Sequence, residues 1–236
     1  MSSKEEMMKI ESMFQNVGAG FNCDILQDGQ NQLKKIVADF PNQLSEGMSE
    51  KDATQILNEI LLRQKFEKMW HPIKVRFAEN TNCSFREESH PNIKLKNGDL
   101  FFVDLGPVFH QHEADYGETF IFNPSHDDPF FLEKSKLITS TKQIFHQAKN
   151  DFLNLGLSGR KLIQRVQEYA RELGYEYNDK MTGHRIGDFP HHLYYRGPLM
   201  DCDEVLISNR WILEIHLRCE INGVKVGAFF EDILSH

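Results

Sequence analysis

Two aspartates near the middle of the chain are the first residues whose spacing suggests chemistry. Asp104 lies near the end of a β-rich run, and Asp115, eleven residues later, opens the next one. The break at Gly106-Pro107 is typical of a hairpin, and a loop at Phe109-His110 places Asp104 directly opposite Asp115. Like charges in facing positions on neighbouring strands repel. Two carboxylates held there need a shared proton or a cation between them, and we expect a cation.

A second acidic pair flanks the clearest turn signal in the sequence. Asn222-Gly223 stands between two alternating apolar runs, and this dipeptide favours a type I′ hairpin because both residues adopt positive φ. A hairpin centred there pairs Glu214 with Glu231, although a bulge at Gly227 would shift the register by one residue. An unpaired charge in such an apolar setting is costly. This pair therefore also indicates a bound cation.

The histidines between these pairs supply a different kind of ligand. His184 stands between Gly183 and Gly187 in a short loop, a position where a histidine is often structural, and His191-His192 follow. With four carboxylates, one imidazole completes a set suited to two divalent ions such as Mn, Fe, Co or Zn, whereas Mg alone does not require it. Two ions about 3.5–4 Å apart generate hydroxide near neutral pH and polarise a carbonyl. That chemistry hydrolyses amides.

The spacing of apolar residues predicts the elements that position these groups. Ser49 and Asp52 form a capping-box pattern, with Asp in place of the usual Glu, so a helix begins there. Alternation predicts a strand over 72–78, and polarity predicts a loop over 79–97. Further helices are expected over residues 4–15, 24–40, 130–153 and 158–173.

A faint internal repeat bears on domain organisation. Gly47-Met48-Ser49, followed by Gln55 and Glu59, recurs 109 residues later as Gly156-Leu157-Ser158, followed by Gln164 and Glu168. The match is either chance or the trace of two related α/β halves, each a helix feeding a strand pair. No linker rich in Gly or Ser separates the halves. We expect a helical segment over 1–45 and one catalytic domain over 46–236.

Composition restricts the partners. The chain of 236 residues is 40% hydrophobic and 26% charged, enough for a substantial core, and its net charge is −8. No cluster of Lys and Arg indicates nucleic acid or an anionic membrane surface as a partner. The four cysteines are scattered, the start lacks an apolar signal core, and no run reaches the roughly 18 apolar residues of a membrane span. We expect a cytoplasmic protein.

Together these residues resemble the pita-bread superfamily of metallopeptidases, which includes methionine aminopeptidases, Xaa-Pro aminopeptidases, prolidases and creatinases. The resemblance covers roughly residues 45–234 and implies an α+β fold in which a pseudo-twofold pair of α/β halves shares a curved antiparallel sheet. It implies that the metal ligands, in chain order, are Asp104, Asp115, His184, Glu214 and Glu231.

The resemblance also implies the remaining roles. Glu214 is expected to shuttle the proton as well as to bind metal. His191, seven residues after His184, is expected to contact substrate and to stabilise the tetrahedral intermediate, and His192 and His90 are further candidates for substrate binding. The runs Phe-Phe-Val-Asp-Leu-Gly-Pro and Gly-Glu-Thr-Phe are closer to the Xaa-Pro and creatinase branch than to the methionine enzymes.

Several positions depart from the family pattern. Glu214 is followed by Ile215-His216 rather than proline, and His192 replaces a frequent glutamate. Where the family carries a catalytic histidine upstream of the first aspartate, this chain has Arg86-Glu87. His90 or His71 could substitute for it, although neither has the family's spacing. The separate N-terminal domain of prolidases is expected to be replaced by about 45 helical residues.

The first functional hypothesis is a dinuclear-metal hydrolase that cleaves an amide, namely an aminopeptidase or Xaa-Pro-type peptidase that acts on short peptides and is able to form a homodimer. A creatinase-like or other metal-dependent enzyme acting on a small metabolite is the first alternative, with an iron-dependent redox or lyase step included. The second alternative is a pita-bread module that binds a partner without catalysis. Its difficulty is that such modules usually lose the ligands, whereas all five are present here.

Overall fold

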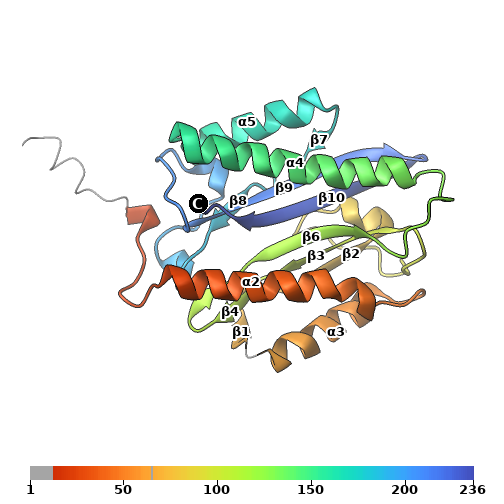
Figure 1. The fold of residues 1–236 in the computed structure, drawn as a ribbon, viewed down its shortest axis with the longest axis horizontal. Helices are drawn as coiled ribbons and strands as arrows, with labels where there is room; N and C mark the ends of the chain where they lie inside the picture. Colours follow the sequence, from red (N-terminus) through yellow and green to blue (C-terminus); the bar gives the residue numbers. More distant parts are fainter. Residues whose placement is uncertain (1–12, 65) are drawn as a thin grey trace, which may run out of the picture.

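In the computed structural model, which describes residues 13–64 and 66–236, two pairs of helices lie against a long antiparallel sheet (Figure 1). The α-helices are α2 (Cys23–Asp39), α3 (Glu50–Arg63), α4 (Phe131–Leu155) and α5 (Gly159–Glu172). Short 3₁₀ segments lie at Met13–Gln15, Phe40–Gln43, Ala78–Asn82, His191–Leu193 and Leu199–Asp201. The helix expected over 4–15 falls mostly outside the described residues. None of the described helices has the length and apolar character needed to cross a membrane.

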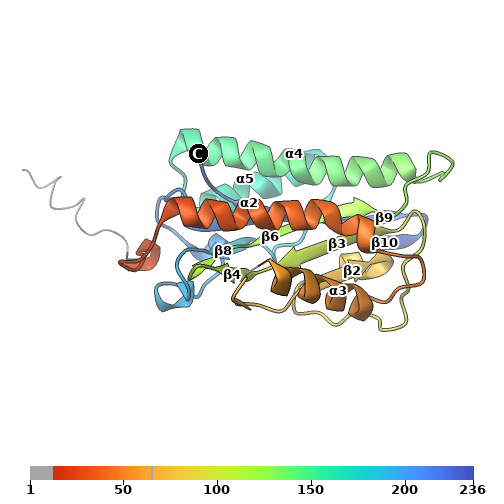
Figure 2. The ribbon, with the colours of Figure 1, turned by 60° about the horizontal axis from the view of Figure 1, so that its bottom comes forward.

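The strands form two sheets. They are β1 (Lys68–Met69), β2 (Lys74–Phe77), β3 (Leu100–Leu105), β4 (Pro107–Phe109), β5 (His112–Glu113), β6 (Tyr116–Ile121), β7 (Glu176–Tyr177), β8 (Gly183–Arg185), β9 (Trp211–Ile221) and β10 (Val224–Ile233). The main sheet has the order β2-β3-β6-β10-β9-β7, with β8 also paired to β9, and the small sheet has the order β1-β4-β5. Figure 2 shows α2 and α3 on the side of β2, β3 and β6, whereas α4 packs on β9 and β10, and α5 packs against α4 and β7.

The two halves repeat one another in detail. Ser49 caps α3 and Ser158 caps α5, each through its side chain, and each follows two residues after a glycine with positive φ. Strand pairing also repeats, since Lys74 pairs with Asp104 in the first half and Gly183 pairs with Leu213 in the second, 109 residues later. The sequence repeat therefore reflects two related halves rather than chance.

The predicted hairpin at Asn222-Gly223 is confirmed. Both turn residues have positive φ, 52° and 73°, as a type I′ turn requires. The pairing of β9 with β10 runs without a bulge from Val224 opposite Ile221 to Ile233 opposite Ile212, and Glu214 faces Glu231. The alternative of a register shift at Gly227 is therefore wrong.

The predicted register of the first hairpin is wrong by two residues. Asp104 pairs with Gly117, not with Asp115. The turn lies at His110-Gln111, one residue later than expected, and both of its residues have positive φ although neither is glycine. A turn one residue later moves every partner by two positions. The two aspartates therefore stay on the same face of the hairpin as diagonal rather than facing neighbours.

Helix α2 belongs to the same core as the residues after position 45. Leu33, Val37 and Phe40 are buried in one hydrophobic cluster with residues of α3, α4, α5 and the main sheet. From the same helix, Gln30 donates to the backbone carbonyl of Asp115 (2.5 Å) and accepts from its N–H (3.0 Å). The helical segment before position 45 thus supports the candidate site directly.

Candidate metal centre

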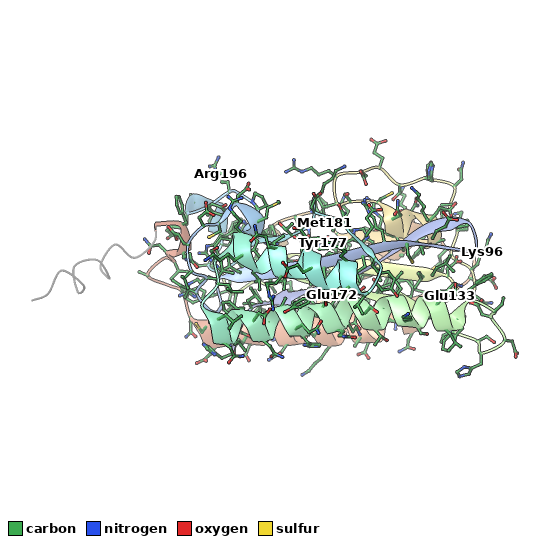
Figure 3. The ribbon with its side chains drawn as sticks, turned by 90° about the horizontal axis from the view of Figure 1, so that it is seen from above. Lys96, Glu133, Glu172, Tyr177, Met181 and Arg196 are labelled. Carbon is green, nitrogen blue, oxygen red and sulfur yellow. The ribbon has the colours of Figure 1, made fainter. Side chains whose placement is uncertain are left out.

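A cavity of about 710 Å³ opens beside the main sheet, and all five ligands expected from the sequence line it. They come from different strands: Asp104 from β3, Asp115 from the residue before β6, His184 from β8, Glu214 from β9 and Glu231 from β10. In Figure 3, α4 runs along one side of the sheet, whereas Arg196, which also lines the cavity, lies on the opposite side. The helices thus cover one face of the sheet, and the cavity opens on the other.

The acids and His184 lie within coordination reach of one another. His184 Nε2 is 2.8 Å from Asp115 Oδ2 and 4.0 Å from Glu214 Oε1. Asp115, His184 and Glu231 each present a ligand atom within 4.8 Å of the other two. Asp104, Asp115 and Glu231 are at most 3% exposed.

His71, which sequence spacing argued against, enters the same cluster. Its Nε2 lies 3.4 Å from Asp104 Oδ1 and 3.3 Å from Asp115 Oδ1. These three residues form a second group of potential ligands within 4.8 Å, and Asp115 belongs to both groups. Asp115 therefore stands between two imidazoles, with one carboxylate oxygen facing each.

The buried carboxylates are not satisfied by the protein. Among the described residues, Asp104 Oδ1, Asp115 Oδ2 and Glu231 Oε1 have no hydrogen-bond partner. An imidazole nitrogen lies near two of these oxygens, but these contacts lack hydrogen-bond geometry. Buried charged oxygens are normally hydrogen-bonded or bound to metal. The donor set of carboxylate oxygens and imidazole nitrogens fits divalent first-row ions.

The pKa values of the cluster show the same need for positive charge. Burial raises the pKa of Asp104, of Glu214 and most strongly of Glu231. Burial alone lowers the pKa of His71 and of His184, but nearby carboxylates outweigh it and raise both to about 9. Without another cation, these pKa shifts favour protonation of Glu231 and of both imidazoles near neutral pH. A divalent ion can replace these protons.

The same kind of hydrogen bond orients both imidazoles for metal binding. Nδ1 of His184 lies 2.6 Å from the carbonyl oxygen of Arg185, and Nδ1 of His71 lies 2.9 Å from that of Pro72. A carbonyl accepts a hydrogen bond, so the proton of each neutral ring sits on Nδ1 and the lone pair on Nε2. Such a bond to the second ring nitrogen is the usual support of a metal-binding histidine.

His191 lies beside this cluster. Its ring stacks on that of His184 at 5.6 Å between centroids, and Nδ1 lies 2.6 Å from Oε2 of the buried Glu113. The backbone N–H of His191 donates to the other Glu113 oxygen at 3.0 Å. Trp70 packs edge-on against His71, His184 and His191. The indole and Glu113 therefore fix the imidazole orientations around the cavity.

His90 and His192 were also assigned to substrate binding. His90 is exposed and is not among the residues that line the cavity, and its backbone N–H and carbonyl bond to Asn80. The structure therefore does not bring His90 to the acids, and its contact with substrate stays a prediction from the sequence. The side chain of His192 lies outside the described part of the structure.

The position of His71 follows from the pairing of two strands. Strand β2 runs antiparallel to β3 with Lys74 opposite Asp104, so a residue just before β2 must lie near the end of β3. His71 occupies that place, beside Gly106. Spacing along the chain does not show this, whereas strand pairing does.

A curved antiparallel sheet in two related halves, with helices on one face and a buried acid–imidazole cavity on the other, defines the pita-bread class of fold. The profile of metallopeptidase family M24 matches residues 24–235. The chain belongs to this family.

Solved structures of known peptidases share the fold at low identity. An X-Pro aminopeptidase from Thermotoga maritima is 18% identical, with a TM-score of 0.71 over 98% of this chain and 64% of its own. A prolidase from Pyrococcus horikoshii is 16% identical, with a TM-score of 0.71 over 94% of this chain and 60% of its own. A methionine aminopeptidase from Thermotoga maritima is 14% identical, with a TM-score of 0.68 over 90% of this chain and 96% of its own.

The two Xaa-Pro-type structures are longer than this chain, which spans 64% and 60% of their lengths. No curated protein matches the chain. At these identities the likeness shows the fold alone.

Proposed function

We propose that the protein is a dinuclear-metal hydrolase that cleaves an amide bond in short peptides, in the manner of an aminopeptidase or Xaa-Pro peptidase. One observation carries the proposal: acids from four places in the chain and two imidazoles meet in one cavity, with buried carboxylate oxygens unsatisfied. Membership of metallopeptidase family M24 supports the same chemistry. Two bound divalent ions supply an activated water and polarise the scissile carbonyl.

The chain's own residues have distinct proposed roles. Asp104, Asp115, His184, Glu214 and Glu231 hold the ions. Glu214 also carries a proton, which suits a carboxyl whose pKa burial raises towards neutrality. His191 contacts the substrate and steadies the developing oxyanion, with its ring oriented by Glu113.

The cavity lining supports a short peptide as substrate. Phe85, Met181 and Pro198 give it an apolar wall, and Arg86 and Arg196 add positive charge. An apolar wall suits a proline ring or another apolar side chain, and the cations suit the terminal carboxylate of a di- or tripeptide.

The alternative of a creatinase-like enzyme on a small metabolite is favoured by one specific observation. Where the family carries its upstream catalytic histidine this chain has Arg86-Glu87, and Arg86 lines the cavity. The choice of metal among Mn, Fe, Co and Zn, a homodimeric state and a cytoplasmic location stay predictions from the sequence.

The proposal is tested on metal-free protein prepared with a chelator. We expect titration calorimetry to show two ions per chain, and Mn- or Co-loaded protein to hydrolyse Xaa-Pro dipeptides or Met-peptides. Hydrolysis of creatine-like amides alone would establish the alternative substrate. Tight metal binding without hydrolysis of either class would contradict the hydrolase proposal and point to the redox or lyase alternative, and absence of metal binding would indicate a binding module.

The matched variants are Asp104→Ala and Asp127→Ala. Asp104 is buried in the cluster, whereas Asp127 is exposed and remote from the cavity lining. We expect Asp104→Ala to abolish binding of at least one ion and all hydrolysis, and Asp127→Ala to change neither. Activity that survives in Asp104→Ala would show that the catalytic site is elsewhere.

A further inference from the structure

His71 lies within ion-pair distance of two buried acids, and the same spacing suits a metal ligand. Its Nε2 is nearly equidistant from Asp104 Oδ1 (3.4 Å) and Asp115 Oδ1 (3.3 Å). Two ligand atoms that share an ion at about 2.0–2.1 Å lie roughly 3–4 Å apart. The spacing thus leaves an ion's place between the three atoms, and the His71 side chain is only 11% exposed.

The orientation of the ring is set from outside the cluster. The Pro72 carbonyl accepts from Nδ1 at 2.9 Å, which turns Nε2 towards the carboxylates, where it donates when protonated and can bind an ion when neutral. Trp70 and Phe85 pack edge-on against the ring, at 4.3 and 5.4 Å between centroids. These contacts orient the ring without help from an ion.

The backbone beside His71 is adapted to admit the imidazole. A Cβ at Gly106 would lie 2.1 Å from His71 Cδ2 and 2.2 Å from Nε2, closer than any real contact. The N–H of Trp70 donates to the Gly106 carbonyl at 2.8 Å, which holds the two segments together. Only glycine at this position lets the ring reach the acids.

We propose that His71 is a sixth protein ligand, which with Asp104 and Asp115 holds one of the two ions, while His184 with Asp115 and Glu231 holds the other. This inference rests on the proposed function, since it assumes that two ions bind. The five-ligand set implied by the family resemblance contains a single imidazole for both ions. In this chain each ion has an imidazole of its own.

An imidazole on each ion has a consequence for metal choice. Nitrogen ligands suit Zn, Co and Fe better than Mg, which prefers oxygen ligands only. The site in the first half of the chain is therefore expected to discriminate against Mg as strongly as the site in the second half.

The direct test counts imidazoles on the wild-type protein by X-ray absorption after loading with two zinc ions per chain. If His71 is a ligand, the two histidines give an average of one imidazole per zinc. If His71 is only a counter-charge, His184 alone gives one half, and the inference is overturned. This measurement does not depend on any variant or on activity.

Titration calorimetry with ZnCl₂ on His71→Ala gives the second readout. Loss of a residue that only hydrogen-bonds to a metal ligand lowers metal affinity by about 10–100-fold. Loss of the ligand itself should therefore lower the affinity for one ion by at least about 100-fold. The other ion should keep its affinity. The control His90→Ala changes an exposed histidine and should bind both ions as the wild type does.

The outcomes separate this inference from the proposed function. Two ions bound with unchanged affinity by His71→Ala would overturn the sixth ligand but leave the hydrolase proposal intact. Failure of the wild type to bind two ions would overturn both. His71→Gln, which keeps more of the side-chain volume, serves as the second variant if thermal unfolding shows that His71→Ala does not fold.

Discussion

The two halves of the molecule share a scaffold but place their imidazoles by different means. His184 lies inside β8, where pairing with Ile212 of β9 sets its position. His71 lies before β2, outside any strand, and its position depends on Trp70, Pro72 and Gly106. Strand register therefore positions one imidazole, whereas side-chain packing positions the other.

The difference shows how a duplicated fold can keep its scaffold and still change its site. The repeated features are local ones: the capped helices α3 and α5, and the same register of β2 on β3 and of β8 on β9. The contacts that orient side chains towards the cavity are not repeated. Changes to these contacts alter the site without altering the fold.

The largest expected effect is that of Asp115→Ala. Asp115 is the residue that both halves share, since its two oxygens face His71 at 3.3 Å and His184 at 2.8 Å. We expect loss of both ions by calorimetry and hydrolysis at background level. An Asp115→Ala protein that kept one ion at wild-type affinity would show that the two halves bind metal independently. Asp115 would then not be a ligand shared by both halves.

His191→Ala tests a contact that crosses between the halves. His191 belongs to the second half, and the Glu113 carboxylate that holds it belongs to the first. We expect turnover to fall by about 10²–10³-fold, as for loss of one oxyanion donor, while metal content stays at the wild-type value.

Glu113→Gln is the companion variant, since it keeps the size of the side chain but removes its charge. A smaller fall in kcat than in His191→Ala is expected for a residue that only positions the ring. Loss of metal in His191→Ala would instead make His191 a ligand and reverse its proposed role.

Two glycine substitutions separate fold from site. In Gly183→Ala the new Cβ would lie 2.1 Å from the Ile212 backbone oxygen, at a φ of 108° that other residues rarely adopt. We expect a loss of about 3 kcal/mol or more in the free energy of unfolding, measured with urea, because neither backbone can move aside.

In Gly106→Ala the new Cβ would meet side chains, those of His71 and Trp70, which can move. We expect a smaller loss of stability, about 1–2 kcal/mol, together with a weakening of one ion by about 10–100-fold. Equal effects of the two substitutions on stability and on metal binding would mean that the two imidazoles are held in the same way.

The smallest effects are expected at the helix caps, where the halves are alike. The side chain of Ser49 accepts from the N–H of Asp52, and that of Ser158 accepts from the N–H of Lys161. Alanine at either serine should cost about 1 kcal/mol in the free energy of unfolding. Metal binding should not change in either variant. A loss of stability in only one of the two variants would show that the two caps contribute unequally to the stability of the protein.

The two hairpins show what local sequence can predict. Asn222-Gly223 predicts its turn type, because only a few residue types favour two consecutive positive φ values. The register of β9 on β10 that was predicted from this turn is correct. His110-Gln111 adopts the same kind of turn without glycine, and the predicted register was two residues off. Positive φ in such residues is imposed by the surrounding strands, and the local sequence does not show it.

The residues of the candidate site likewise include some that the sequence identified and some that it did not. Its acids and His184 could be named from turns, alternation and family resemblance, and the structure brings them to one cavity. Neither His71 nor His90 has the family's spacing to Asp104, and His90 alone was kept as a candidate for substrate binding. Glu113 and Trp70 carried no signal that linked them to His191.

The sequence alone determined the capping box at Ser49, the turn of the second hairpin and the acids that need a cation, because each depends on residues close in the chain or on a simple period. Only the tertiary structure decided that His71 joins those acids, that Gln30 of α2 supports Asp115, and that His90 does not line the cavity. These contacts join segments far apart in the chain. Their geometry follows from how the sheet bends and how side chains pack around it, which no local pattern encodes.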